Sequence, residues 1–367
     1  MDADITLIAT SPGADDGLQG VSRQARHPQD VFQLGPFCLA SFTSLDEVIA
    51  NSVWARRGWT FQEGCLSTRR LIFTDHGVVY MCHSMQRWET IEQEVTEEDG
   101  QNRGVITHLE RILPNFKSLP PDVWWNMLVE EYTGRALSFD EDALHACLGI
   151  LKALNVSHHW GVKIIEAVSF SNHKPPVMDL YWRSVKPAHR RKGFPTWSWT
   201  SCTGSKDFGS STPFMEDVSV VEIQTDEKQG QWVNATERTR DQLAKLREVR
   251  SGQRLRVTGA FLKPVWVTEN GEYHVRILAH PDKLSVFLDT TAATMVAHEN
   301  TEALVIEPNY NDMSPIVMLL YPHGDHHRRF GIAQSSAPRE LSMWALRHAG
   351  SRPAWMEHVK VRTVFVE

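Results

Sequence analysis

The run Arg-Arg-Gly-Trp-Thr-Phe-Gln-Glu that starts at Arg56 contains residue types suited to chemistry on a nucleotide. If this run is helical, Trp59 and Glu63 are i, i+4 neighbours on one face of the helix. A carboxylate beside an indole wall could stabilise a cationic ribosyl transition state, as in cleavage of the nicotinamide–ribose bond of NAD. Arg56 and Arg57 could bind the pyrophosphate of that ligand.

The same spacing also has a structural interpretation. Trp59 and Phe61 would then be packing residues, while Glu63 would pair with Arg69 or cap a turn. A Trp-x-x-x-Glu spacing arises by chance in many helices, so the spacing alone favours this structural interpretation.

A second group of residues, His323, Asp325, His326 and His327, offers three imidazoles and a carboxylate to a zinc or other divalent ion. Adjacent histidines of a strand point to opposite sides, and the group follows a predicted strand in a polar loop. We therefore favour a solvated turn over a metal site, and we interpret the histidine pair at 158–159 in the same way.

Composition limits the classes of protein that the chain can be. The 367 residues carry 38 basic and 45 acidic side chains, a formal charge of −7, and 41% of them are hydrophobic. This balance excludes a wholly disordered chain and argues against a nucleic-acid binder. No apolar run approaches the length of a membrane helix, and the N-terminus is acidic where a signal peptide is basic. We expect a cytoplasmic protein without a membrane span.

The five cysteines are widely spaced and contain no C-x-x-C, so we expect neither a disulfide framework nor a structural zinc site. Cys65 has arginines nearby but no base within reach in the sequence, and we interpret it as a buried small apolar residue. Phosphate-loop, dinucleotide-binding, nucleophile-elbow and zinc-protease motifs are absent from the sequence.

The elements that must position these residues are predicted from periodicity and turn signals. The first part holds a strand at residues 4–10, a short helix after a Ser44–Glu47 capping box, a helix at 53–66 broken near Gly58, and a hairpin at 70–82. After an acidic linker at 87–103, the middle holds amphipathic helices near 124–132, 144–154 and 177–185, the second of them preceded by a Ser138–Glu141 capping box. The rest holds short β-rich runs between 218 and 366, interrupted by helices at 236–250 and 339–348.

The fold class predicted in this way is α+β. We divide the chain into an α/β segment at 1–86, a helical region at 105–190 and a mainly antiparallel β-domain at 195–367. We further expect the strand at 4–10 to lie at or near the edge of a small, incomplete parallel sheet, with part of its apolar surface exposed or covered by another segment. Trp197 and Trp199 should share one face of a strand, with Ser198 on the other, and pack against the helical region.

The segment 54–82 resembles the closing part of the fungal heterokaryon-incompatibility (HET) domain. The resemblance rests on an Arg-Gly-Trp-Thr-Phe-Gln-Glu core that starts at Arg57, followed by Leu66, Ser67, Arg69 and Phe73. The opening strand and the Gly-Leu-Gln-Gly-Val loop at 17–21 are similar to the segment that precedes this core. A second specific match is the Pro-Thr-Trp-Ser-Trp-Thr-Ser run at 195–201, and looser matches lie at 125–137, 142–150 and 329–332.

The resemblance implies a TIR-like, flavodoxin-like α/β fold for residues 1–86, of which this chain holds a truncated remnant, because the upstream HET motifs are missing. It implies that Trp59 and Glu63 match the Trp-Cys-x-x-Glu pattern of NAD-cleaving TIR domains, with Thr60 in place of the cysteine. We expect a protein of fungal non-self recognition and programmed cell death that acts through protein partners or self-association, without catalysis and without a cofactor. The alternatives are an NAD-cleaving hydrolase that uses Glu63, and a metal-dependent enzyme at His323, His326 and His327.

Overall fold

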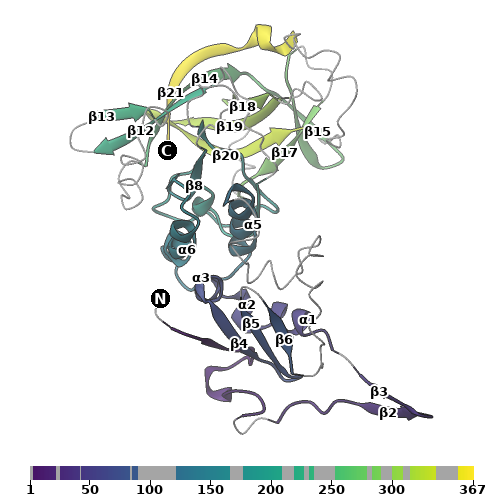
Figure 1. Cartoon of the computed structure of the whole chain (residues 1–367). Coiled ribbons are helices and arrows are strands. Elements are labelled where there is room, and N and C mark those ends of the chain that lie inside the picture. Colours follow the sequence, from purple (N-terminus) through teal and green to yellow (C-terminus); the bar gives the residue numbers. More distant parts are fainter. Residues whose placement is uncertain are drawn as a thin grey trace. The chain divides into compact units, whose positions relative to one another are not determined.

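The computed structural model describes most of the chain and divides it into two compact units, residues 1–155 and 156–367, which are treated separately below (Figure 1). The described residues are 3–21, 25–41, 43–82, 85–89, 121–165, 177–208, 219–226, 231–234, 253–278, 283–290, 300–308, 315–335 and 354–367. The predicted helices at 236–250 and 339–348 lie outside them, as does most of the acidic linker. The model combines helices with mostly antiparallel sheets, which confirms the α+β class.

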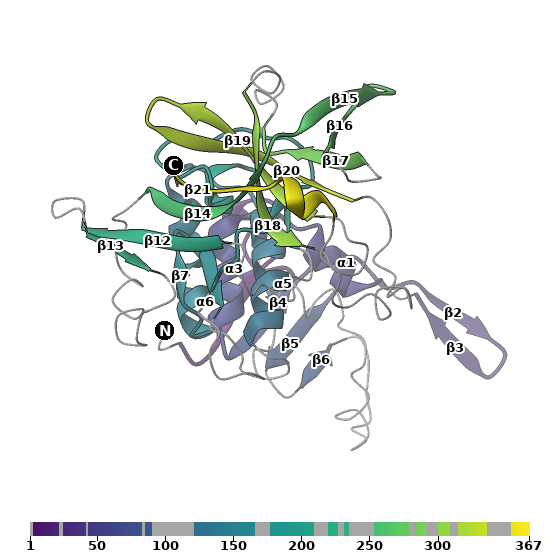
Figure 2. The same cartoon turned by 90° about the horizontal axis from the view of Figure 1, so that it is seen from above.

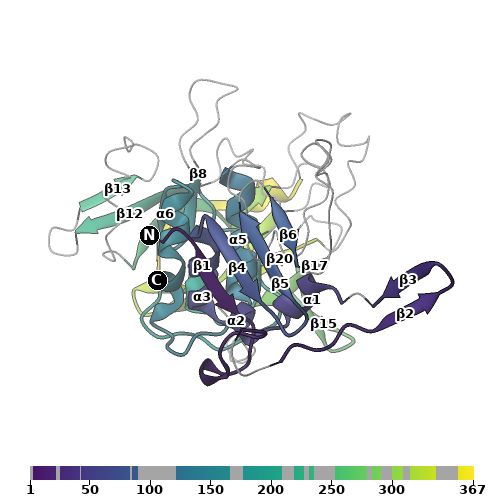
Figure 3. The same ribbon diagram turned by 60° about the horizontal axis from the view of Figure 1, so that its bottom comes forward.

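The first unit contains a mixed sheet in the order β1-β4-β5-β6 (Figure 3). Its strands are β1 (Thr6–Ala9), β4 (Arg69–Phe73), β5 (Val78–Cys82) and β6 (Gln86–Trp88). Strands β1 and β4 are parallel, and the other pairs are antiparallel. The predicted edge position is confirmed, because β1 has one neighbour among the described strands, and Leu7 is exposed while Ile8 is buried. The predicted parallel sheet is corrected, because β5 and β6 join it antiparallel.

The helices of the first unit lie close to the predicted ranges. They are α1 (Leu45–Ala50), α2 (Val53–Arg56), α3 (Gly58–Leu66), α5 (Pro121–Thr133) and α6 (Asp142–Ala153). The predicted break near Gly58 is confirmed, since extended backbone at Arg57 separates α2 from α3. The two capping boxes are corrected: Ser44 and Glu141 occupy the N-cap positions, but neither side chain makes a capping hydrogen bond.

A short 3-10 helix, η1 (Ala14–Asp16), and a two-stranded hairpin connect β1 to α1. The hairpin consists of β2 (Val31–Leu34) and β3 (Phe37–Ala40), which pair antiparallel around a Gly35-Pro36 turn. Gly35 has a φ of 60°, a conformation that glycine adopts without steric cost. The hairpin extends away from the β1-β4-β5-β6 sheet of its own unit (Figures 1 and 3). The sequence analysis did not predict it.

The second unit begins with short strands where a third amphipathic helix was predicted. These are β7 (His158–His159), β8 (Val162–Ile165), β9 (Val177–Met178), β10 (Arg183–Ser184) and β11 (Lys206–Asp207). The helix predicted at 177–185 is therefore wrong. Its apolar residues are buried on more than one side, because Asp179 to Trp182 enter a core rather than lie on one face of a helix.

Ten strands of the described residues form one large sheet in the second unit. They are β12 (Ser219–Asp226), β13 (Gln231–Asn234), β14 (Leu255–Leu262), β15 (Val265–Glu269), β16 (Glu272–Arg276), β17 (Lys283–Leu288), β18 (Glu302–Pro308), β19 (Pro315–His323), β20 (His326–Gln334) and β21 (Lys360–Val366). All neighbours are antiparallel except β20 and β21. Strands β12 and β13 form one end of the sheet and β15 to β17 the other (Figure 2).

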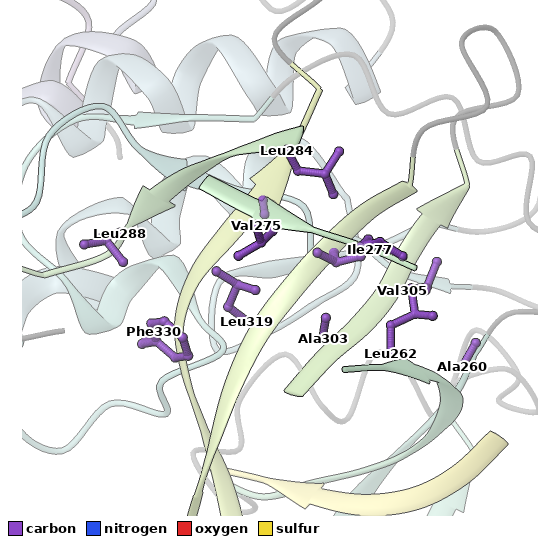
Figure 4. Packing of buried hydrophobic residues seen from close by; sticks show 12 residues of the cluster. Ala260, Leu262, Val275, Ile277, Leu284, Leu288, Ala303, Val305, Leu319 and Phe330 are labelled. Atoms are coloured by element: carbon purple, nitrogen blue, oxygen red, sulfur yellow. The ribbon is translucent and has the colours of Figure 1, made fainter. Parts of the chain in front are cut away.

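Part of the large sheet closes into a ring. Strand β14 pairs with β18 and β21, and β20 pairs with β19 and β21, so the hydrogen-bonded path β14-β18-β19-β20-β21 returns to β14. A cluster of aliphatic side chains and Phe330 packs between the strands (Figure 4). Its fully buried members include Val275, Leu284, Val305 and Leu319. This core holds the predicted antiparallel β-region together.

The predicted strand through Trp197 and Trp199 is also corrected. Ser198 caps a 3-10 helix, η3 (Trp199–Ser201), and accepts a hydrogen bond from the Thr200 N–H. Both indoles are buried, but they use different partners: Trp197 Nε1 donates to the Gln253 carbonyl at 2.8 Å, and Trp199 Nε1 donates to the Gly161 carbonyl at 2.6 Å. Because a turn replaces the strand, the two side chains do not share one face.

No helix within the described ranges is both long enough and apolar enough to cross a membrane.

Candidate functional site

The start of α3 is fixed by contacts of Gly58. Its N–H donates to the Ala136 carbonyl at 2.7 Å, and the Ala136 N–H donates to the Arg56 carbonyl at the same distance. A Cβ atom at Gly58 would lie 2.4 Å from the Leu137 side chain. The segment after α5 therefore approaches α3 closely, and a larger residue at position 58 would require the Leu137 side chain to shift.

The three residues from Thr60 to Gln62 attach α3 to neighbouring helices of the first unit. Phe61 is fully buried and stacks on Tyr132 at 6.2 Å, with the Arg135 guanidinium 4.3 Å from the ring centre. The Gln62 Oε1 atom accepts a hydrogen bond from the Gly149 N–H at 2.6 Å. Thr60 Oγ1 bonds to the backbone at the end of α2. Three consecutive residues thus have a packing or hydrogen-bonding role within the first unit.

Trp59 and Glu63 lie on α3 four residues apart, as predicted, and both are exposed. Trp59 Nε1 donates to the Asp142 carboxylate at 3.0 Å, at the first residue of α6. The backbone carbonyl of Glu63 accepts from Ser67 Oγ at 2.6 Å. In the described part of the chain, the Glu63 carboxylate makes neither a hydrogen bond nor an ion pair, so the proposed pairing with Arg69 is not formed there.

Arg56 and Arg57 differ in whether they line a cleft. Both side chains are exposed, but Arg56 lines a cleft of about 490 Å³ in the first unit, whereas Arg57 does not. Trp59 and Glu63 are not among the residues that line it either. The structure thus places one of the four sequence-predicted site residues in this cleft.

The cleft lies at the carboxyl ends of β1 and β4, the two parallel strands. Ligands of α/β sheets bind in this position, because the loops that leave parallel strands diverge there. The lining side chains are mostly polar: Thr10, Ser11, Gln19, Thr43, Ser44, Glu47, Asn51, Ser52, Arg56, Asp75 and His76, with Pro12, Val48 and Val53. The sequence analysis missed all of these except Arg56. A signal was present, since Thr10-Ser11 lie at the end of the strand predicted at 4–10 and Asp75-His76 lie in the turn of the hairpin predicted at 70–82.

The charges of the cleft are mixed rather than basic. Glu47 and Asp75 contribute two carboxylates against the single guanidinium of Arg56. His27 Nε2 lies 3.4 Å from Asp75, and the His27 and His76 rings stack with their centres 5.2 Å apart. Hydroxyl and amide groups around two carboxylates suit a polar ligand with hydrogen-bond donors better than a pyrophosphate.

Cys65 belongs to α3 and is buried, as predicted. Burial raises the pKa of its thiol to about 12, although Arg135 and Arg70 lie close enough to oppose the shift. Arg70 is itself buried and donates to the Gly64 and Cys65 carbonyls. A thiol in this environment stays protonated and is not a nucleophile.

Two histidines of the second-unit cluster contact carboxylates individually rather than converging on one metal site. His326 Nδ1 lies 3.1 Å from Asp325, and His327 Nε2 lies 3.0 Å from Glu302. Arg254 pairs with the same Asp325 at 2.9 Å. Across the residues that the structure describes, no group of histidine, cysteine and acidic side chains is arranged to hold a metal ion. The metal-enzyme alternative is therefore not supported at this turn.

The pair His158 and His159 was predicted to be solvated, and this is wrong. Both lie in β7 and are buried, and the His159 ring stacks on Trp197 with centres 5.5 Å apart. The long-range contact with Trp197 explains the difference, since nothing in the local sequence indicates it.

A buried charged group connects the short strands of the second unit to its large sheet. Arg329 and Asp289 are both fully buried, and the Arg329 Nε atom lies 3.0 Å from the Asp289 carboxylate. Arg329 also donates to the carbonyls of Leu180 and Trp182, and its guanidinium lies 3.5 Å from the centre of the Trp182 ring. Lys206, nearby in the same core, donates to two backbone carbonyls. Arg329 lies in the loose match at 329–332, whereas no signal in the sequence indicated its partners.

No protein-family model, curated protein or solved structure matches this chain.

Proposed function

We propose that this chain is a HET-like protein of fungal non-self recognition and regulated cell death, which acts in the cytoplasm through protein interaction and without catalysis of its own. The observation that carries the proposal is the exposed apolar surface at two separate places in the first unit, at Leu7 on the edge strand and on the β2–β3 hairpin. Apolar surface of this kind marks a site of protein contact.

The geometry of the motif supports the same conclusion. Gly58, Phe61 and Gln62 hold α3 against the neighbouring segments, so these motif residues have a structural role. The parallel pair β1 and β4 is compatible with a remnant of a TIR-like α/β fold, and we propose that origin for the first unit. The β-rich second unit would then be the sensor or regulator.

An NAD-cleaving hydrolase that uses Glu63 is the second candidate. The observation in its favour is the exposed Glu63 carboxylate, which has no hydrogen bond or ion pair within the described ranges and lies one helical turn from Trp59. Against it, the cleft that Arg56 lines includes neither residue. A catalytic carboxylate and a pyrophosphate-binding arginine would be expected in one cavity.

The two candidates are separated by expressing the chain in a fungal host and measuring growth, together with nicotinamide release by the purified protein. Three forms are compared: the wild type, Glu63→Gln, and a control, Glu272→Gln, that alters an exposed carboxylate on β16 of the second unit. The proposal expects all three forms to arrest growth equally and to release no nicotinamide.

Two results would change this conclusion. If Glu63→Gln alone abolishes both growth arrest and nicotinamide release, the chain is an NAD-cleaving enzyme. If the wild type leaves growth unaffected, the proposed role in cell death is wrong.

A further inference from the structure

The β2–β3 hairpin has one strongly apolar face. Directly paired residues of antiparallel strands lie on the same face. Phe32 pairs with Leu39, and Leu34 pairs with Phe37, so these four large side chains share one face. The opposite face carries Val31, Gln33, Cys38 and Ala40. The four residues Phe32, Leu34, Phe37 and Leu39 are called the hairpin face below.

The hairpin face is open to solvent in the single chain. Its side chains are between 51% (Leu39) and 67% (Phe37) exposed. Among the described strands, β2 and β3 pair only with each other. A two-stranded hairpin is marginally stable in water unless its apolar face packs against something else. The hairpin therefore needs another surface that packs against this face.

The area of the hairpin face fits a second copy of the chain. With about 200 Å² for a fully exposed phenylalanine, the two rings contribute roughly 260 Å², and the two leucines bring the face to roughly 450 Å². Two such faces stacked on each other bury about 900 Å², and contacts at their rims bring the total to the roughly 1,000 Å² expected of a specific interface.

The charge of the hairpin also permits this contact. The ten residues from 31 to 40 contain no acidic or basic side chain, although the whole chain carries a formal charge of −7. Two copies can therefore stack these faces without placing like charges opposite each other. A charged partner would gain no complementary contact on the same face.

We propose that two copies of this chain associate by stacking their hairpin faces, with Phe32 and Phe37 at the centre of a two-fold interface. Such an isologous contact is self-complementary, because each hairpin presents the same four side chains to the other. This inference deepens the proposed function by naming a partner and a surface. It is tested on the purified chain alone, so it can fail independently of that function.

The test is sedimentation equilibrium of the full chain from about 1 to 100 μM, a range that detects micromolar self-association. The wild type should form dimers. Phe37→Asp and Phe32→Asp place a charge on the hairpin face and should each raise the dissociation constant by at least about 30-fold, as expected for a central interface residue. Gln33→Asp adds the same charge to the opposite face and should leave dimerisation unchanged. Thermal unfolding of all four forms shows whether the variants remain folded.

A wild type that stays monomeric at about 100 μM would overturn the inference, whatever the growth assay shows. So would a dimer that survives both phenylalanine variants, or one that Gln33→Asp weakens as much as Phe37→Asp does. Conversely, the inference is supported if the wild type forms a dimer that dissociates in the hairpin-face variants alone. This holds even if the wild type has no effect on growth.

Discussion

Removal of the Asp289 carboxylate should strongly destabilise the second unit. Asp289→Asn keeps the size of the side chain but leaves the Arg329 guanidinium without a counter-charge. Both groups are fully buried, and the other described partners of the Arg329 guanidinium, two carbonyls and the Trp182 ring, carry no net charge. Breaking one half of a buried ion pair costs about 3–5 kcal/mol, because the remaining charge is desolvated and uncompensated.

The free energy of unfolding is measured by urea denaturation, followed through the tryptophan fluorescence of the second unit. Trp182, Trp197 and Trp199 all lie in its core and report its unfolding. Glu222→Gln is the matched control, because it neutralises the partner of Arg256 in a partly exposed pair, where the loss should be about 1 kcal/mol or less.

The reasoning also predicts a rescue. Replacing Asp289 and Arg329 together with apolar residues of similar volume should recover part of the stability lost by Asp289→Asn, since no uncompensated charge remains. If Asp289→Asn costs less than about 1 kcal/mol, or no more than Glu222→Gln, the argument from burial is refuted.

Three further predictions concern single residues. Burial lowers the pKa of Lys206 to about 8 in the folded chain, whereas its pKa in the unfolded chain is about 10.4. The unfolded state therefore binds more protons between these pH values, and the free energy of unfolding should rise by about 2–3 kcal/mol from pH 8 to 10.4. Urea unfolding across this range should show the rise in the wild type but not in Lys206→Met. Gly149→Ala places a Cβ 2.6 Å from Gln62 Oε1 and should cost about 1–3 kcal/mol in thermal unfolding, less in a Gln62→Ala background. Trp197→Ala removes a fully buried indole and should lower Tm by at least about 5 °C; a change under about 1 °C would show that the indole is peripheral.

Local signals predicted the elements of the first unit well. The hairpin at 70–82 and the break near Gly58 depend on residues close together in sequence, and both are present. The β2–β3 hairpin had an equally local signal, a Gly-Pro turn between two apolar runs, which the analysis overlooked.

The errors in the second unit arise from contacts between distant residues. His159 is buried because Trp197 covers it, and the helix predicted at 177–185 is replaced by short strands in a packed core. The alternation of tryptophan and serine from Trp197 to Trp199 indicated a strand. Instead, Ser198 Oγ accepts a hydrogen bond from the Thr200 N–H, and the segment forms a turn.

The candidate cleft could be predicted only in part. Arg56 was identified from its charge, whereas Glu47 and Asp75 come from separate segments that meet where β1 and β4 run side by side. One sequence does not specify that pairing, because it depends on which strands become neighbours in the folded sheet.

The closed ring of strands has a consequence for how the second unit is made. One edge of β14 pairs with β12, and most of the other edge pairs with β21, which lies roughly a hundred residues later in the chain. This second edge stays unpaired until β21 has been synthesised. During synthesis on the ribosome, β14 therefore leaves the exit tunnel with an open edge that can pair with neighbouring chains. We expect the nascent chain to depend on chaperones over this interval, and to lose that dependence once β21 has emerged.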